Sequence, residues 1–276
     1  MTDPVFDVLL DSGAYSAYMS GKPINLDDYI AFCHEWKKYL WGYAALDVIK
    51  DPKATLQNWK EMRRQGLNPI PIHTVGHKKK TMDRMFEQSK LVMLGGIFGG
   101  QKDNRQAIKL RHKWAGGRPV HWLGYSRMDM MQTFMPFSVD STNWKSGMIH
   151  GHVAVYLGSG NWERITHKQC REGKPVSKQF LRICETCGFS RRDLRDEELW
   201  NITKKVGWRR SIPTQLSVYS WVQFSLEYYE RFGTRYFLAG WGADPRSPDA
   251  IAYWARHFTG YNLKEKEDAK QSKIPW

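Results

Sequence analysis

The first 140 residues alternate short apolar runs with amphipathic stretches, and this alternation restricts the fold more than any other feature of the chain. Six apolar runs have the character of strands, and a stretch with helical spacing follows each of the first five. This rhythm predicts an α/β protein built from parallel βαβ units. Because polar residues or glycines follow the strands, six units in succession favour a closed (β/α)8 barrel, a TIM-like barrel, over an open sheet. The expected strands are 5–10, 41–48, 69–75, 91–97, 120–125 and 137–140, and the expected helices are 26–39, 52–65, 81–89, 104–114 and 128–133.

The alternation changes after residue 144. Residues 148–157 and 162–165, joined by Gly158-Ser159-Gly160-Asn161, predict a β-hairpin. Helical spacing returns at 176–187 and 213–232, a late strand is expected at 234–241, and a final helix at 248–258. We therefore expect one barrel domain over residues 1–276. Residues 148–212 form a hairpin and helical insertion after the sixth strand, and residues 262–276 form a frayed charged tail.

The charge balance favours a polyanionic partner. The chain holds 42 Lys and Arg against 28 Asp and Glu, a net charge of +14. A basic surface without a specific ligand is the alternative, but basic clusters interleaved with aromatics favour nucleic acid. The basic residues expected to contact phosphates are Lys78, Lys79, Lys80, Lys204, Lys205, Arg209 and Arg210.

Nothing in the sequence predicts a membrane partner or an oxidising compartment. The chain begins Met-Thr-Asp-Pro, without a basic and apolar leader, and no apolar run approaches the length of a membrane span. Its four cysteines do not resemble a secreted disulfide framework. We expect a soluble cytoplasmic protein.

Polar residues and glycines follow the predicted strands where a barrel places its chemistry. Asp11 comes after the first strand and Asp140 ends the sixth. Between them the strand ends supply Asp47, His73, Gly95-Gly96 and Gly124, which a barrel would gather around one mouth. Two carboxylates brought together there can divide the work of a nucleophile and of an acid or base.

Five of these segments carry a resemblance to a known family. Asp11-Ser-Gly-Ala-Tyr-Ser is similar to the Asp-Ser-Gly-Gly-Phe-Gln signature of tRNA-guanine transglycosylases. The later segments Leu46-Asp47, 94–97, 121–125 and 139–142 fall in the order of that family's barrel motifs. In chain length and in the residues of these motifs, the chain most resembles the phage branch, the DNA-guanine transglycosylases, which put 7-deazaguanines into DNA. The resemblance covers the first half of the chain well and the second half poorly.

The resemblance assigns chemical roles to the two aspartates. Asp140 resembles the nucleophile that attacks C1′ of the guanosine sugar and forms a covalent glycosyl ester, as in a retaining glycosidase. Asp11 resembles the residue that protonates the departing guanine and deprotonates the incoming base. Taken singly, Asp11 reads as a turn residue before Gly13 and Asp140 as a helix cap. Their joint occurrence within the wider pattern favours catalysis.

The resemblance also implies a purine pocket. Asp47 is similar to the residue that accepts hydrogen bonds from N1–H and the 2-amino group of guanine, and the alternative is a local cap. Gly95 and Gly96 would let the backbone approach the flat base, with N–H groups toward its carbonyl oxygen, or they form an ordinary turn. His73 stands where the family often has a base-reading glutamine, and a core histidine is the alternative. Tyr15 replaces a phenylalanine that stacks on the base, and Ser16 replaces a glutamine.

A structural zinc is an open question in the sequence. tRNA-type members hold zinc with three Cys and one His after the nucleophile. Here His167-x2-Cys170 and Cys184-x2-Cys187 offer four ligands, whose spacing departs from the family's tight cysteine cluster. The alternative is that Cys184 and Cys187 are small apolar core residues of a helix. The exchange chemistry itself requires no cofactor.

The function expected from this resemblance is exchange of guanine in DNA for a 7-deazaguanine base such as preQ0, in the host cell cytoplasm if the chain is phage-encoded. The chain length and the lack of an evident RNA-binding domain favour DNA over the first alternative, the same exchange on tRNA. The second alternative is a non-catalytic nucleic-acid-binding barrel. Because C1′ of a paired nucleotide is out of reach, the target must be flipped out or single-stranded.

Overall fold

A computed structural model of the chain describes residues 8–96, 104–200 and 211–239. These residues form two compact units, one that extends to Asp140 and one over Ser141–Ala239. The expected helix 248–258, the charged tail and the basic residues Lys204, Lys205, Arg209 and Arg210 lie outside the described residues.

The first unit contains parallel strands whose spatial order follows the order of the chain. β1 pairs with β2, a single bridge joins Ala44 to Ile70, and the order then continues β3-β4-β5-β6. The pairs β1·β2, β3·β4, β4·β5 and β5·β6 are parallel, as successive βαβ units require. The strands are β1 Leu9–Leu10, β2 Gly42–Tyr43, β3 Ile72–His73, β4 Val92–Leu94, β5 Val120–Trp122 and β6 Ser138–Ser141.

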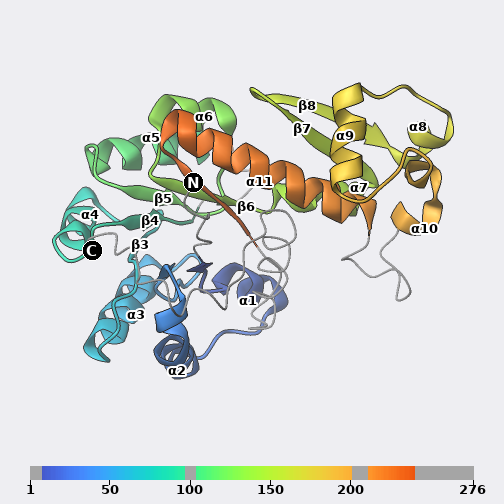
Figure 1. Ribbon diagram of the computed structural model, residues 1–276. Coiled ribbons are helices and arrows are strands. Elements are labelled where there is room, and N and C mark those ends of the chain that lie inside the picture. Colours follow the sequence, from blue (N-terminus) through green and yellow to red (C-terminus); the bar gives the residue numbers. More distant parts are fainter. Residues whose placement is uncertain (1–7, 97–103, 201–210, 240–276) are drawn as a thin grey trace. The chain divides into compact units, whose positions relative to one another are not determined.

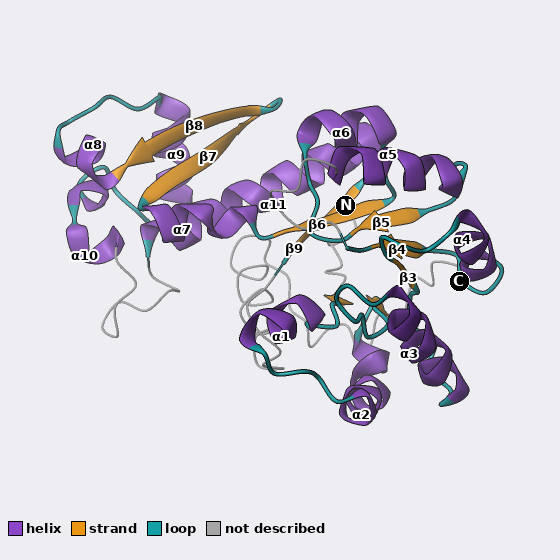
Figure 2. Ribbon diagram, turned by 180° about the vertical axis from the view of Figure 1, so that it is seen from behind, coloured by secondary structure: helices purple, strands orange, loops and turns teal. Residues whose placement is uncertain are grey.

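A helix follows each of the first five strand regions, and Figures 1 and 2 show α2 to α6 arranged one after another around the outside of the strands. Local capping defines where two of them begin. Asn25 Oδ1 accepts from the N–H groups of Asp27 and Asp28, and Asp51 Oδ1 accepts from the N–H of Ala54. The helices are α1 Ala14–Ser20, α2 Leu26–Trp36, α3 Pro52–Arg64, α4 Lys79–Phe86, α5 Asn104–Ala115 and α6 Met128–Phe134.

The alternation of strands and helices expected in this unit is confirmed, although the ladders are shorter than the apolar runs. Helix α1 was not expected, and it begins directly after Gly13, whose φ of 72° suits a residue without a side chain. A buried cluster of Ala44, Ile70, Ile72, Leu91 and Met93 fills the region between neighbouring strands. The unit is thus mixed α/β, and closure into a barrel remains a prediction.

The second unit contains the expected β-hairpin, in which β7 and β8 pair antiparallel. The turn conformation explains why glycines occur here, because Gly158, Ser159 and Gly160 all have positive φ. Beside the hairpin are α9 and α11, which begin at the capping residues Ser177 and Ser211. The elements of this unit are α7 Ser146–His150, β7 His152–Gly158, β8 Asn161–Thr166, α8 His167–Arg171, α9 Lys178–Thr186, α10 Glu197–Trp200, α11 Ile212–Phe232 and β9 Arg235–Leu238.

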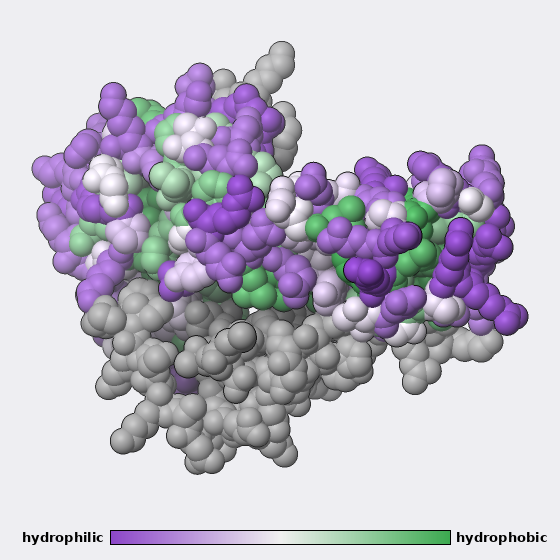
Figure 3. Space-filling model, turned by 45° about the horizontal axis from the view of Figure 1, so that its top comes forward, coloured by the Kyte–Doolittle hydropathy of each residue, from purple (hydrophilic) through white to green (hydrophobic). Residues whose placement is uncertain are grey.

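An aromatic cluster holds this unit together. The rings of Trp162 and Trp221 lie 4.9 Å apart between centroids, and Phe224 contacts both of them and Tyr156. Trp162 and Trp221 are only half-buried, and apolar residues show among hydrophilic ones on the face of this unit drawn at the right of Figure 3. After β9, the N–H of Ala239 donates to the carbonyl of Ser141 at 2.9 Å.

Within the described ranges, no helix combines the length and the apolar character that crossing a membrane requires.

Candidate active site

Asp140 lies in strand β6, and its carboxylate is held at one oxygen. Oδ1 accepts from the backbone N–H of Gly124 at 2.8 Å and lies 3.1 Å from Nε2 of His121. The side chain is 22% exposed, so it is reachable from solvent while two contacts fix it. Neither contact uses Oδ2.

His121 is the partner that sequence reasoning did not assign. In the β5·β6 ladder it stands opposite Ser138, and its Nδ1 lies 2.8 Å from Ser138 Oγ. Because residues two apart on a strand share a face, Ser138 and Asp140 both point toward the His121 ring. His121 and Ser138 are both completely buried. Asp140, the candidate nucleophile, therefore contacts a buried histidine that in turn contacts a buried serine.

Asp11 lies just after β1, at a position accessible to solvent but closely surrounded by protein. Loss of solvation first, and the negative charge of Asp140 second, raise the pKa of its carboxyl to about 6. Hydrogen bonds from the N–H groups of Ser12 and Gly13 oppose the shift. The structure thus brings Asp11 and Asp140 together and leaves Asp11 able to hold a proton near neutral pH.

Asp47 follows β2 and is held by Thr55, whose hydroxyl donates to Asp47 Oδ1 at 2.7 Å. Burial raises the pKa of this carboxyl, and the Thr55 hydrogen bond opposes the shift. Its other oxygen faces the end of β4, because a Cβ on Gly95 would lie 3.6 Å from Asp47 Oδ2. Asp47 and Gly95 are therefore brought together.

The two glycines after β4 sit where no side chain fits. A Cβ on Gly95 would lie 2.7 Å from Ile72 Cγ2, and a Cβ on Gly96 would strike Thr74 Oγ1. The expectation that Gly95 aims its N–H at a base is wrong, because that N–H donates to the carbonyl of His73 at 3.1 Å. Gly96 has a φ of 69°, which a residue without Cβ adopts at no cost.

Leu123 joins the two halves of the site. A Cβ on Gly95 would lie 3.5 Å from Leu123 Cδ1, so this side chain packs beside the glycine that faces Asp47. The next residue, Gly124, donates its N–H to Asp140. The consecutive residues Leu123 and Gly124 therefore connect the two pairs, since Leu123 packs beside Gly95 and Gly124 binds Asp140.

Arg111, from the buried face of α5, ties two strand ends together. Its Nη1 donates to the carbonyls of His73 at 2.8 Å and Gly95 at 2.6 Å, and the residue is 3% exposed. Burial lowers the pKa of the guanidinium to about 10. Charge-assisted bonds to two carbonyls fix the backbone that carries the glycines.

His73 lies beneath the surface of the site. Its ring is completely buried, Nε2 lies 3.3 Å from the carbonyl oxygen of Lys78, and burial lowers its pKa to about 3. His77 packs edge-on against it and lies 2.7 Å from the carbonyl of Pro52 through Nε2. Both histidines support the loop after β3, where His73 is buried and His77 is half-buried.

Tyr15, in the first turn of α1, is 52% exposed. It follows Asp11 by four positions in the chain, with Ser12, Gly13 and Ala14 between them. Exposed aromatic rings of this kind are the side chains on which bases stack in proteins that bind single strands. Ser16, which follows it, is also exposed.

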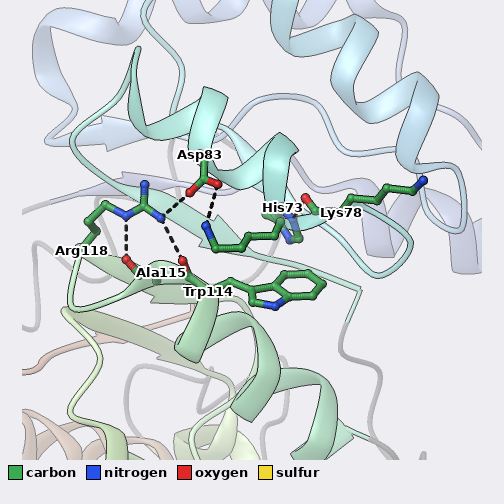
Figure 4. A network of polar contacts seen from close by, with 7 residues as sticks. His73, Lys78, Asp83, Trp114, Ala115 and Arg118 are labelled. Atoms are coloured by element: carbon green, nitrogen blue, oxygen red, sulfur yellow. Dashed lines mark hydrogen bonds and ion pairs between the residues drawn. The ribbon is translucent and has the colours of Figure 1, made fainter.

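The basic cluster Lys78–Lys80 begins α4 and is exposed. Figure 4 shows the network that supports it: Asp83 accepts from Lys79 Nζ and from Arg118 Nη2, each at 2.8 Å, and Arg118 also donates to the carbonyls of Trp114 and Ala115. Lys78 points its ammonium away from Asp83 in this view. Lys79 is therefore paired with a carboxylate that it shares with Arg118, while Lys78 presents its charge outward.

The described residues contain no group of three or more His, Cys, Asp or Glu side chains arranged to hold a metal ion. Among the four zinc candidates, His167 Nε2 lies 3.2 Å from the carbonyl of Arg195. Cys170, Cys184 and Cys187 are buried free thiols, and burial raises the pKa of Cys170 to about 11 and of Cys184 to about 12. Zinc binds cysteine as the thiolate, and a structural zinc at these four residues stays a prediction.

Two signals in the sequence pointed to the groups that were missed. His121 is the polar residue between the apolar Val120 and Trp122 of β5. Ser138 and Asp140 are separated by the apolar Val139, so both lie on the same face of β6. Arg111 lies three positions after the buried Ile108 and four before the buried Ala115, on the inner stripe of its helix. A buried polar residue at such a position must have a partner.

The arrangement can hold a proton on one carboxyl, Asp11, beside a second carboxylate, Asp140, whose one oxygen is occupied by donors. Such a division between two acidic groups suits acid–base work at one residue and nucleophilic work at the other. No protein-family model, curated protein or solved structure matches this chain.

Proposed function

We propose that this chain is a guanine transglycosylase that exchanges guanine in DNA for a 7-deazaguanine such as preQ0. The observation that carries the proposal is the pairing of Asp11, whose pKa is raised to about 6, with Asp140. The five segments that resemble the family's motifs overlap or follow the strands β1, β2, β4, β5 and β6. The parallel order from β1 to β6 supports the (β/α)8 barrel that belongs to this proposal.

In the first half of the reaction, Asp140 attacks C1′ of the target nucleotide. The C1′–N9 bond breaks and its electron pair leaves with guanine, which takes a proton from Asp11. A covalent ester between Asp140 and the sugar remains, and Asp11 is now a carboxylate.

In the second half, the Asp11 carboxylate removes the N9 proton of the 7-deazaguanine. N9 attacks C1′, the ester bond breaks and Asp140 recovers its carboxylate, while Asp11 is protonated again. The proton balance therefore closes over one turnover, and the reaction consumes no redox or nucleotide cofactor.

Base selection rests on Asp47 and the glycines. The Asp47 carboxylate accepts from N1–H and the 2-amino group of a guanine-like base, which adenine does not offer. Gly95 and Gly96 let the backbone after β4 lie against Ile72 and Thr74, which a Cβ on either glycine would meet, and Gly95 lies beside Asp47. Tyr15 is exposed and provides a stacking surface.

DNA is the proposed substrate because of the charge of +14 and the exposed cluster led by Lys78. The experiment incubates the protein and radiolabelled preQ0 with duplex DNA, single-stranded DNA and tRNA in parallel. Asp140→Asn serves as the inactive variant, and Asp129→Asn, at an exposed aspartate paired with Arg105 and Arg127, as the matched control.

We expect label in DNA with the wild type and Asp129→Asn, and none with Asp140→Asn. Label confined to tRNA would contradict the DNA assignment and identify the substrate as tRNA. Nucleic-acid binding without label in either polymer would contradict exchange and indicate a binding module.

A further inference from the structure

A buried histidine stands directly behind the proposed nucleophile. We propose that His121 is a positioning residue: together with the N–H of Gly124 it holds Oδ1 of Asp140, so that Oδ2 is the oxygen that attacks the sugar. This inference rests on the proposed function, because it assigns a role within the same site.

The contacts on Asp140 are one-sided. Gly124 N–H and His121 Nε2 both meet Oδ1, at 2.8 and 3.1 Å. Two contacts on one oxygen restrict rotation of the carboxylate and reduce the electron density available at that oxygen. The other oxygen is left for bond formation.

Ser138 sets the state of the His121 ring. Its hydroxyl lies 2.8 Å from Nδ1, and both residues are completely buried. When the hydroxyl donates to Nδ1, the ring proton resides on Nε2 and points at Asp140. The β5·β6 register enforces this geometry, because His121 and Ser138 are directly paired on neighbouring strands.

The arrangement has a use at each stage of the exchange. While the glycosyl ester exists, Oδ1 is the ester carbonyl oxygen and still accepts from both donors. When the incoming base displaces the sugar, negative charge returns to Asp140, and both hydrogen bonds strengthen as it does. His121 therefore acts through Asp140 and does not touch the substrate.

The test compares two polar substitutions of the same residue. In His121→Gln the amide nitrogen takes the place of Nε2 and still reaches Asp140. In His121→Asn the amide ends near the place of Nδ1, so it keeps the contact with Ser138 and loses the one with Asp140. His112→Asn, at a half-buried histidine of α5 outside the site, is the control.

We expect His121→Asn to lower kcat roughly 10- to 100-fold, the range for loss of one hydrogen bond to a charged group. KM for preQ0 should stay within about threefold, because Asp47 and the glycines are untouched, and His121→Gln should recover most of kcat. Circular dichroism and nucleic-acid binding report whether each variant is folded.

Equal kcat values for the Asn and Gln variants, whether both high or both low, would overturn the role of His121. In that case an inactive Asp140→Asn would leave the proposed function intact. Exchange that survives in Asp140→Asn would instead overturn the proposed function itself. If His121→Asn does not fold, Ser138→Ala decides: it frees the ring without removing it, and unchanged kcat contradicts the inference.

Discussion

Asp11 and Asp140 come from the first and sixth strand ends and act on each other through their charges. The protein surroundings first, and the charge of Asp140 second, raise the pKa of the Asp11 carboxyl to about 6. Asp140 instead accepts the N–H of Gly124 and contacts His121. One carboxyl is thus prepared to hold a proton, and the other is held in place by two contacts at one oxygen.

The raised pKa of Asp11 predicts how the first half-reaction depends on pH. Guanine release needs protonated Asp11, so its single-turnover rate should fall as pH rises through about 6. The attack of the incoming base needs ionised Asp11 and should rise over the same interval. Rapid-quench measurements of each step from about pH 4.5 to 8 check both directions. A release rate that does not change across this range would contradict the role of Asp11.

The same shift predicts a change in stability. The folded-state pKa lies above the ordinary value of 3.8, so this contribution to stability is present below about pH 4 and is lost as pH rises through about 6. Asp11→Asn should therefore raise Tm relative to the wild type at about pH 7.5 and not at about pH 4. Since Asp11 is accessible to solvent, the gain should be small. Thermal unfolding at the two pH values measures it, and a Tm lowered at the higher pH would contradict the direction.

Gly96→Ala should damage the base pocket. Its Cβ would strike Thr74 Oγ1 and lie 3.1 Å from the N of Val75. Gly117→Ala is the matched control, because its φ of 81° imposes a similar strain of about 1–2 kcal/mol while no atom lies within 4 Å. We expect KM for preQ0 to rise at least about tenfold in Gly96→Ala and to be unchanged in Gly117→Ala. Equal kinetics for the two variants would remove Gly96 from the pocket.

Arg111→Met should destabilise the unit by about 2–4 kcal/mol, because two backbone carbonyls lose a charged donor. Lys109→Met, on the exposed side of the same helix, removes the same charge and should change the free energy of unfolding by less than about 0.5 kcal/mol. Urea unfolding of the two variants provides the comparison. Similar losses in both would show that charge, and not the pair of carbonyl contacts, is responsible.

Lys78 should contribute more to DNA binding than Lys79. Lys79 is paired with Asp83 at 2.8 Å, whereas Lys78 directs its ammonium away from that carboxylate. Lys78→Gln should reduce the slope of log K against log salt by about 0.7–0.9, the value for one phosphate contact. Lys79→Gln should change the slope less. Titrations at several salt concentrations measure both, and the reverse order would contradict phosphate contact by Lys78.

The fold of the first unit could be predicted from sequence because its periodicity is strong. The predicted strand runs 41–48, 91–97 and 137–140 are mainly apolar and short, and the strands β2, β4 and β6 fall on them. Helix α1 could not be foreseen, since its seven residues follow a glycine turn without a capping side chain. Short elements of this kind form through packing and not through local propensity.

The site could be predicted only in part. The residue types at Asp11, Asp47 and Asp140 were visible at strand ends, but their distances depend on the sheet and not on local sequence. The pairing of His121 with Ser138 requires the β5·β6 register, and the use of the Gly95 N–H requires the β3·β4 ladder. Both follow from tertiary structure, which periodicity does not encode.

The central claim, a covalent bond between Asp140 and the sugar, can be observed directly. The protein is incubated with a guanine-containing single-stranded DNA without preQ0, denatured, and resolved on a gel, and the adduct is digested for mass spectrometry. We predict a protein–DNA species joined at Asp140, absent in Asp140→Asn and chased into modified DNA when preQ0 is added. An adduct that forms equally in Asp140→Asn, or exchange that proceeds with no adduct at any time, would contradict the account.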